Sequence, residues 1–595
     1  MKTIASFLKY IFRYRREVVD RILFYVSLIC VLTATVHIGY ITNPVVARYT
    51  ERMVFIMFYG LFACELFRTF SSIFALNKVN VSHYSGLIVI LYFVIVVLLR
   101  FTDGDAHSLM AKQEWIYLGI GIVFLSELSK RSLFFDNFYF NPTILFVISF
   151  IGLILIGTLL LMLPRATNYA SLGFIDAFFM ATSAVCITGL TVMDVPTNFT
   201  LFGQTVIMVL IQVGGLGIMT FTGFFGYFFS GGFSFKNQLM FGEILGENKL
   251  NSVISTLLTI IFITLLFEFI GGVFIFMTLD AALFDSVGER VFFAAFHAIS
   301  SFCNAGFSIL HEGIANDAYR FNYGFQLVLT MVFILGGLGF GTVYNFYTYL
   351  KSKVSQIVHM YILKRNYKHK PQIFQFNSKF VLTCNIVVIV LATVSYFLME
   401  QNNTLREDKH VFGEWVTSLF MANSARSAGF NSIGLDSLNM PTLIMFSTLM
   451  WIGVSPGSTG GGVKVTTVAI AMMNILALAK GKEAIEIYRR RIAVESVHKA
   501  FAIIVLSVLA IGVSFVLLNF SDPQLPMKSL LFEAISAYTT CGFSLGITPL
   551  LSPAGKMIVI ATMFIGRVGT LTLLVAFIKN TRNKSYLYPT EKILF

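Results

Sequence analysis

Charged residues are scarce in this sequence. Of its 595 residues, 12% are Asp, Glu, Lys or Arg, whereas about 25% of an ordinary soluble domain is charged. Hydrophobic residues make up 56%, and the mean hydropathy is +0.79. So few charges in so apolar a chain exclude a soluble globular protein. They predict an all-α protein that crosses a membrane many times.

Sequence patterns typical of metal or redox sites are also absent. The six cysteines contain no CxxC pair, and the nine histidines form no HExxH motif. We therefore expect no disulfide framework and no metal site. No catalytic constellation stands out either, so we expect a protein that is not an enzyme and binds no cofactor.

Acidic residues are missing from the loop between Lys351 and Lys370, which holds six Lys or Arg side chains. Because loops rich in Lys and Arg stay on the cytoplasmic side, this loop is predicted to be cytoplasmic. Helix count places the basic stretch 480–499 and both termini on the same side of the inner (cytoplasmic) membrane. This sidedness explains the net charge of +13, and no nucleic-acid partner is expected.

Long apolar runs are what the chain has instead. A helix needs about 20 apolar residues to cross the hydrocarbon core, and about twelve such runs are present. The first four lie near 21–41, 51–75, 84–101 and 113–129. They form an N-terminal block of about four helices within residues 1–135.

Behind that block one pattern recurs four times: a long apolar helix, a segment too short to span, a glycine loop and a second long helix. The four modules are predicted at 140–235, 250–352, 375–478 and 495–582, with a cytoplasmic tail at 583–595. Their short segments are expected at 172–186, 290–303, 411–425 and 527–540, and their second long helices at 202–230, 322–350, 441–476 and 554–579. Non-helical backbone at membrane depth must line protein or water, so the glycine loops are expected to face one another.

Each loop centres on one glycine, and the four glycines are spaced almost regularly. Glycine lets the carbonyls around it turn inward without a Cβ clash, and rings of backbone carbonyls hold dehydrated cations in channels. The loops therefore predict a cation pore with pseudo-fourfold symmetry. Glycines that serve helix packing are the alternative for any single loop. The loops are Thr188-Gly189-Leu190, Ala305-Gly306-Phe307, Ala428-Gly429-Phe430 and Cys541-Gly542-Phe543.

Several segments resemble one known family, in the expected order. They are SAVCITGLTV (183–192), QVGGLGIMTF (212–221), FCNAGFS (302–308), SARSAGFNS (424–432), SPGSTGGGVKVTT (455–467), TTCGFS (539–544) and FIGRVGTLTL (564–573). Over roughly residues 140–595 the chain resembles the Trk/Ktr/HKT superfamily of potassium transporters, and within it the membrane subunits called KtrB and TrkH.

The resemblance implies a filter for K⁺ as the transported ion. Each module would be a helix, a pore helix, a filter loop and a helix, and four modules would surround one path. Family members with serine in place of the first filter glycine tend to favour sodium, so Gly189 favours potassium. Hydroxyls near the glycines could equally bond within helices. The implied filter residues are Ile187, Thr188, Gly189, Asn304, Ala305, Gly306, Ser427, Ala428, Gly429, Thr540, Cys541 and Gly542.

A glycine-rich stretch interrupts the last helix of the third module, and such a run cannot stay helical. A pliant polar loop at that depth suits a gate below the filter; a plain glycine hinge is the alternative. A phosphate loop is disfavoured because Val463 separates the last glycine from Lys464. The predicted gate residues are Gly457, Ser458, Thr459, Gly460, Gly461, Gly462 and Lys464.

Arg567 falls in the middle of the last predicted helix. A buried arginine there needs a partner or a wet cavity. The resemblance implies that it protrudes into the path near the gate; pairing with a helix C-terminus is the alternative. Glu65 and Arg68, three residues apart, are expected to pair on one helix face, and Glu268 is expected to be paired or packed.

Residues 1–135 depart from the family pattern. No helix there carries the regular arginines of a voltage sensor, so we expect a scaffold or a lipid-facing shell. The resemblance also implies a homodimer and a separate cytosolic ring subunit that binds nucleotides, like KtrA or TrkA. The basic loops 351–370 and 480–499 are candidate docking surfaces for that subunit, or they serve topology alone.

The predicted function is potassium uptake through the four-glycine filter, gated by the third-module loop and Arg567. One alternative is a carrier of the same fold that couples K⁺ to Na⁺ or H⁺. Another is a membrane-embedded enzyme that acts on a phosphorylated lipid, although the acidic metal ligands usual for that chemistry are missing.

Overall fold

The computed structural model describes residues 22–40, 44–75, 89–97, 114–131, 142–168, 172–216, 253–357, 375–408 and 410–577. Helices dominate this part of the chain, and its one sheet is a hairpin of β1 (Glu486–Ile487) and β2 (Arg490–Arg491). The all-α prediction is therefore confirmed. Most of the predicted loop 351–370, the end of the predicted helix 202–230 and the tail 583–595 lie outside the described residues. The chain forms two compact units, the first made mainly of Met1–Tyr139.

The first unit contains the helices Ile22–Gly39, α2 (Pro44–Ala75), residues 89–97 and α4 (Glu114–Arg131). Phe58 is fully buried in it and stacks on Phe93 at 4.6 Å between ring centroids. Helix α2 begins at Pro44, seven residues before the predicted residue 51. Proline is favoured in the first turn of a helix. The prediction started later because the residues after Pro44 include polar ones and do not belong to the apolar run. The predicted Glu65–Arg68 ion pair is confirmed at 2.5 Å, and Arg68 also bonds to Glu127.

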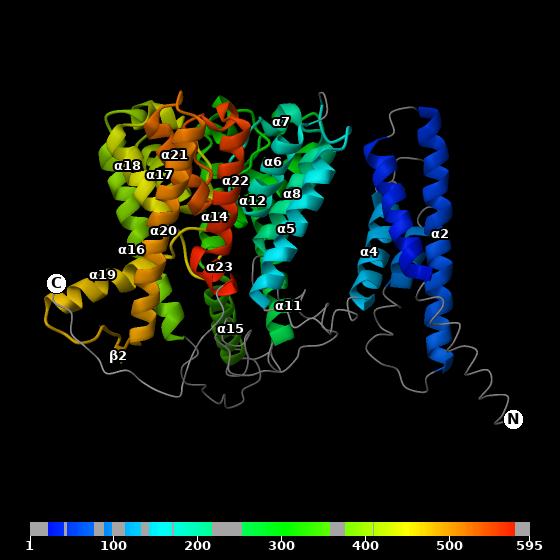
Figure 1. Cartoon of the computed structure of the whole chain (residues 1–595), viewed down its shortest axis with the longest axis horizontal. Coiled ribbons are helices and arrows are strands. Elements are labelled where there is room, and N and C mark those ends of the chain that lie inside the picture. The colour runs from blue at the N-terminus through cyan, green and yellow to red at the C-terminus, as the bar shows by residue number, and fades with distance from the viewer. Residues whose placement is uncertain are drawn as a thin grey trace. The chain divides into compact units, whose positions relative to one another are not determined.

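The second unit begins each repeat with a long helix and continues with a short one. The long helices are α5 (Pro142–Leu161), α11 (Val253–Thr278), α16 (Phe376–Glu400) and α20 (Val494–Ser521). The short helices are α6 (Phe174–Val185), α12 (Val287–Phe302), α17 (Val411–Asn423) and α21 (Met527–Thr539), and they lie in the upper half of Figure 1. Four helices of the described chain are long and apolar enough to cross a membrane alone: Ile22–Gly39, Leu258–Thr278, Phe376–Glu400 and Val494–Ser521.

The helices that close the repeats are α8 (Leu201–Gly215), α14 (Tyr323–Gly337) with α15 (Phe340–Ile357), α18 (Met440–Ile452) with α19 (Val465–Ala479), and α22 (Pro553–Val568) with α23 (Thr570–Phe577). The predicted interruption of the third is confirmed. The predictions of single helices at 322–350 and 554–579 are wrong. Helices α14 and α15 meet at an angle of 99°, and Gly569, with φ +86°, separates α22 from α23.

Gly339 causes the break between α14 and α15. Its φ of +87° lies in the left-handed region, which a continuous helix does not contain. A Cβ at this position would lie 2.5 Å from the Pro456 carbonyl oxygen. The next amide, that of Phe340, donates to the Gly457 carbonyl at 2.8 Å. The helix turns here because its backbone bonds to the loop between α18 and α19.

Short helices and turns connect these elements. The α-helical ones are α7 (Val195–Asn198) and α13 (Asp317–Arg320). The others are the 3₁₀ turns η3 (Ala281–Leu283), η4 (Gly313–Ala315), η6 (Thr404–Glu407), η8 (Leu435–Ser437) and η9 (Thr548–Leu550), and the π turn η7 (Ser424–Ala428). Large apolar side chains such as Phe269 and Met277, both 71% exposed, face outward from α11. An outward apolar surface of this kind is expected of helices that meet lipid.

Candidate functional site

The four short helices end in a similar chain reversal. In three of them the amide just before the loop glycine donates to a serine carbonyl five residues earlier; in the third repeat the glycine amide does so. The bonds are Thr188 to Ser183 (2.8 Å), Ala305 to Ser300 (2.8 Å), Gly429 to Ser424 (3.2 Å) and Cys541 to Ser536 (3.1 Å). A shared reversal places the four glycines at comparable points.

The backbone before the glycines is strained in a repeated way. Ile187, Asn304 and Thr540, each two residues before its glycine, have φ of 58°, 57° and 49°. A non-glycine residue in this left-handed region costs about 1–2 kcal/mol, and such strain clusters at functional sites. The third loop reaches its glycine through the π turn η7, and its equivalent residue is Ser427.

The four glycines lie against one another in a closed ring, which we call the glycine ring. All four have positive φ, between 69° and 94°. At each one the position that a Cβ would take lies almost on a carbonyl oxygen of the next loop, so no larger residue fits. The distances are 2.4 Å for Gly189 to Ala305, 2.8 Å for Gly306 to Ala428, 2.2 Å for Gly429 to Cys541 and 2.2 Å for Gly542 to Thr188.

Hydroxyl oxygens without partners lie beside this ring. Among the described residues, those of Thr188, Ser427 and Thr540 are buried and have no hydrogen-bond partner. Buried polar atoms are normally satisfied. These hydroxyls and the ring carbonyls are therefore oxygens that a dehydrated cation could use as ligands.

The loop between α18 and α19, Gly453–Lys464, packs directly on the residues that precede the ring glycines. Thr459 Oγ1 accepts from Asn304 Nδ2 at 2.8 Å and donates to the Phe302 carbonyl at 3.1 Å. Cβ positions at Gly460 and Gly461 would lie 2.1 Å from the hydroxyl oxygens of Ser427 and Thr540. The α18–α19 loop therefore contacts three of the four glycine loops, each at the residue two positions before its glycine, and Gly460 and Gly461 permit that approach.

Arg567 and Lys464 donate hydrogen bonds to backbone carbonyls of this loop. Arg567, 7% exposed, donates from Nη1 to the Thr459 carbonyl and from Nη2 to that of Gly214, 2.8 Å away in the last turn of α8. Lys464 Nζ donates to the carbonyls of Gly460 at 2.7 Å and Gly461 at 3.2 Å. Arg567 thus contacts both the loop and the C-terminal turn of α8, which fits the alternative of pairing with a helix C-terminus. Its place in an ion path stays a prediction.

One buried arginine of this site escaped sequence reasoning. Arg426, immediately before Ser427, donates to Asn385 Oδ1 at 2.8 Å and to the Gly453 carbonyl at 3.2 Å. It links the third glycine loop to the start of the α18–α19 loop. The signal that could have found it is a charged residue in a segment predicted at membrane depth, SARSAGFNS (424–432).

Glu268 is paired, as expected. It accepts from Gln212 Nε2 at 3.0 Å and lies 3.9 Å from Cys303 Sγ. Cys303, just before the second glycine loop, therefore takes part in the polar contact that Gln212 of α8 and Glu268 of α11 make.

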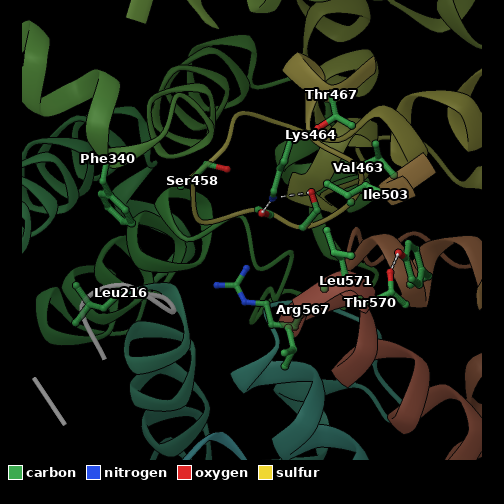
Figure 2. A pocket seen from close by; sticks show the side chains of 18 residues that line it. Leu216, Phe340, Ser458, Val463, Lys464, Thr467, Ile503, Arg567, Thr570 and Leu571 are labelled. Carbon is green, nitrogen blue, oxygen red and sulfur yellow. Dashed lines mark hydrogen bonds between the residues drawn. The ribbon is translucent and has the colours of Figure 1, made fainter. Parts of the chain in front are cut away.

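A cavity of about 300 Å³ opens beside the α18–α19 loop. Figure 2 shows Ser458, Lys464 and Arg567 around it, together with the apolar side chains of Leu216, Phe340 and Leu571. Residues from the breaks between α14 and α15, α18 and α19, and α22 and α23 all contribute to its wall.

Residues 119–587 match the sequence profile of the TrkH family, described as cation transport proteins. The chain belongs to the TrkH family. It is 34% identical to Ktr system potassium uptake protein B of Bacillus subtilis over 456 residues, which are 76% of this chain and 96% of that protein. It is 32% identical to potassium/sodium uptake protein NtpJ of Enterococcus hirae over 76% of this chain and 97% of that protein.

The fold matches as well. The crystal structure of the potassium transporter TrkH from Vibrio parahaemolyticus superposes with a TM-score of 0.59 at 17% identity, covering 83% of this chain and 96% of that one. Membership of the TrkH family makes the chain a transporter rather than an enzyme, which excludes the lipid-enzyme alternative. Residues before 119, most of the N-terminal block, lie outside the family match.

Proposed function

We propose that this TrkH-family chain takes up potassium, and that K⁺ crosses the glycine ring stripped of water and bound by backbone carbonyls. The observation that supports this most is the ring itself. Four glycines with positive φ lie each against a carbonyl of the next loop. A ring of backbone carbonyl oxygens can replace the hydration shell of a cation. The named substrates of the relatives, potassium for the Bacillus protein and potassium or sodium for NtpJ, agree with it.

The α18–α19 loop is the proposed gate, and Arg567 holds it closed by its hydrogen bond to the Thr459 carbonyl. The proposed gate residues of the loop are Gly457, Ser458, Thr459, Gly460, Gly461, Gly462 and Lys464. The support is positional: the loop fills the space against Asn304, Ser427 and Thr540, where ions leaving the ring would pass. A buried arginine at that point also opposes the passage of cations electrostatically.

The proposed orientation puts the glycine ring toward the outside. Helix α15 and strand β2 lie toward the end of the second unit opposite the short helices (Figure 1). The second half of α15 contains Lys351 and Lys353, and β2 consists of Arg490 and Arg491. Basic residues at one end identify the cytoplasmic side. We further propose a homodimer that works with a cytosolic nucleotide-binding ring subunit docked at this basic end.

The test is growth of cells that lack potassium uptake on low potassium, with this chain expressed together with a ring subunit. We expect rescue by the native sequence. Gly189→Ser should lower K⁺ over Na⁺ selectivity, because its side chain would enter the ring beside the Ala305 carbonyl. Failure of the native chain to rescue growth, with protein present in the membrane, would refute potassium uptake.

The gate has its own test. Deletion of Gly460–Gly462 removes the part of the loop that faces Ser427 and Thr540, so we expect K⁺ flux into proteoliposomes to rise severalfold. Arg567→Gln should shift flux in the same direction because it removes a fixed positive charge. Unchanged flux in both variants would leave the loop as a structural hinge.

The remaining candidate is a coupled carrier of the same fold. The Enterococcus relative is named a potassium/sodium uptake protein, which is the observation in its favour. Uptake of K⁺ against its electrochemical gradient, driven by Na⁺ or H⁺, would establish coupling; flux only down the gradient would establish a gated pore.

A further inference from the structure

The cavity beside the α18–α19 loop has an unusual charge for a cation pathway. Two basic side chains, Lys464 and Arg567, line it, and none of its 18 lining residues is Asp or Glu (Figure 2). The hydrogen bonds that these side chains donate go to backbone carbonyls of Thr459, Gly214, Gly460 and Gly461. Carbonyls are dipoles, so they leave both positive charges uncompensated.

Three helix N-termini add to this positive field. Helix α15 begins at Phe340 and α23 at Thr570, and Lys464 is the N-cap of α19; all three residues line the cavity. The N-terminus of a helix carries the equivalent of about half a positive charge, and anions bind at such sites. A lysine at an N-cap is the unfavourable choice for a helix dipole unless a negative charge lies near it.

One donor of this cluster is unused. Arg567 is 93% buried and lines the cavity. Its Nε is buried and has no hydrogen-bond partner. A charged donor held in a low-dielectric site without an acceptor is costly. An acceptor with negative charge in the cavity would satisfy it.

We propose that this cavity is a binding site for a small inorganic oxyanion of the phosphate class. Arg567 and Lys464 are its charged donors, and the N-termini of α15, α19 and α23 supply the surrounding field. A volume of about 300 Å³ accommodates such an ion.

Occupancy has a consequence for the loop. The same two side chains hold the α18–α19 loop through its carbonyls at Thr459, Gly460 and Gly461. An anion competes with those carbonyls for the donors, because its full negative charge attracts the cationic groups of Lys464 and Arg567 more strongly than a carbonyl dipole does. Binding therefore loosens the loop and favours ion flux. This consequence rests on the proposed gate, whereas binding itself does not.

The direct test is binding of radiolabelled inorganic phosphate to the full-length protein in discs of neutral lipid. We expect saturable binding of one ion per chain. Lys464→Gln should weaken it at least about tenfold, the loss typical of one charge-assisted contact. Lys480→Gln is the matched control, since Lys480 is exposed at the opposite end of α19 and should bind as the native protein does. No saturable binding, or equal binding in both variants, would overturn the site.

A second pair of variants guards against misfolding of Lys464→Gln. Thr467 lines the cavity in the first turn of α19. Thr467→Glu would place a carboxylate in the cavity, so it should abolish phosphate binding, while Thr467→Gln should retain it. In proteoliposomes, Thr467→Glu should also raise K⁺ flux and remove any response to phosphate.

The outcomes separate this inference from the proposed function. Phosphate binding by a chain that fails to move K⁺ would refute potassium uptake and leave the site standing. Loss of phosphate binding in discs of anionic lipid would assign the site to a lipid headgroup and overturn the free-ion form. Binding without any change in flux would refute the effect on the loop.

Discussion

At the residue scale, the third glycine loop shows how a short motif makes two structural contacts. Its glycine belongs to the ring, and the arginine three residues earlier holds the start of the α18–α19 loop through Gly453. Asn385, which accepts from Arg426, donates in turn to Ser455 Oγ at 2.7 Å. The third glycine loop and the α18–α19 loop therefore share one buried hydrogen-bond network.

Sequence could identify the ring glycines but not this network. Each of the four loops needs a glycine with positive φ at the same place. The sequence therefore shows four glycines at nearly regular spacing. The partners of Arg426 lie 27 and 41 residues away, and no local pattern indicates which distant carbonyl a buried guanidinium will meet. The same holds for the carbonyls of Thr459 and Gly214 that accept from Arg567.

Potassium affinity should depend on pH through His311. Its Nδ1 lies 2.7 Å from Asp194 Oδ2. Asp194 follows the first ring glycine by five positions, and His311 follows the second by five, so the pair links two of the loops. The hydrogen bond to Asp194 and that residue's charge raise the pKa of His311 above its ordinary value. The pair is therefore complete below about pH 6.5 and is lost as pH rises through the raised pKa.

At higher pH the Asp194 carboxylate is freed from its cationic partner and attracts K⁺ toward the loops. We expect the K⁺ concentration for half-maximal uptake to fall about twofold between pH 6 and pH 8, a small effect because the pair is exposed and screened by salt. Uptake kinetics at both pH values measure it. His311→Gln should show no such shift; a shift of the same size in that variant would assign the pH response to another group.

At the scale of elements, the short helices could be predicted and two of the breaks could not. The predicted segment 527–540 corresponds to α21 (Met527–Thr539), because a polar loop on each side and a length too short to span define it. The break at Gly339 is invisible in sequence, since isolated glycines are common within transmembrane helices. It depends on Pro456 and Gly457, more than a hundred residues away.

That break gives a prediction with a matched control. Gly339→Ala forces a Cβ into left-handed backbone, at a cost of about 1–2 kcal/mol, and against the Pro456 carbonyl oxygen 2.5 Å away. We expect a less stable protein and a displaced α18–α19 loop, measured as a lower melting temperature in detergent and a changed K⁺ flux.

Gly341→Ala is the control two residues along. It lies inside α15, and a Cβ there meets nothing within 4 Å. Replacement of a helical glycine by alanine gains about 0.5–1 kcal/mol. If both variants lost stability equally, contact with the α18–α19 loop would not be the reason for the glycine at 339.

At the scale of the whole molecule, the chain consists of a family core and an added N-terminal unit. The first unit has its own buried centre and its own buried ion pair. The family match begins at residue 119, so the glycine ring and the α18–α19 loop both belong to the matched part. The unit is expected to affect stability rather than selectivity.

Arg68→Met tests that division of roles. It leaves the buried carboxylates of Glu65 and Glu127 without their arginine, and the loss of one partner from a buried pair typically costs about 3–5 kcal/mol. We expect a marked fall in the melting temperature of the first unit. Arg52→Met, exposed on the same helix α2, should change it little. K⁺ over Na⁺ selectivity should be native in both, and altered selectivity in Arg68→Met would link the unit to the ion path.

The most direct test of the central claim compares two glycines of the fourth loop. Gly542 and Gly546 have φ of +94° and +81°, so alanine suffers the same backbone strain at both. A Cβ at Gly542 would lie 2.2 Å from the Thr188 carbonyl oxygen, whereas one at Gly546 meets nothing within 4 Å.

The measurement is the K⁺ over Na⁺ selectivity of uptake for Gly542→Ala and Gly546→Ala in cells that lack other potassium uptake. If the glycine ring is the filter, Gly542→Ala loses selectivity or uptake by at least tenfold, the fold-change that about 1.4 kcal/mol produces, and Gly546→Ala retains both. Native selectivity in Gly542→Ala, or equal loss in the two variants, would contradict the account.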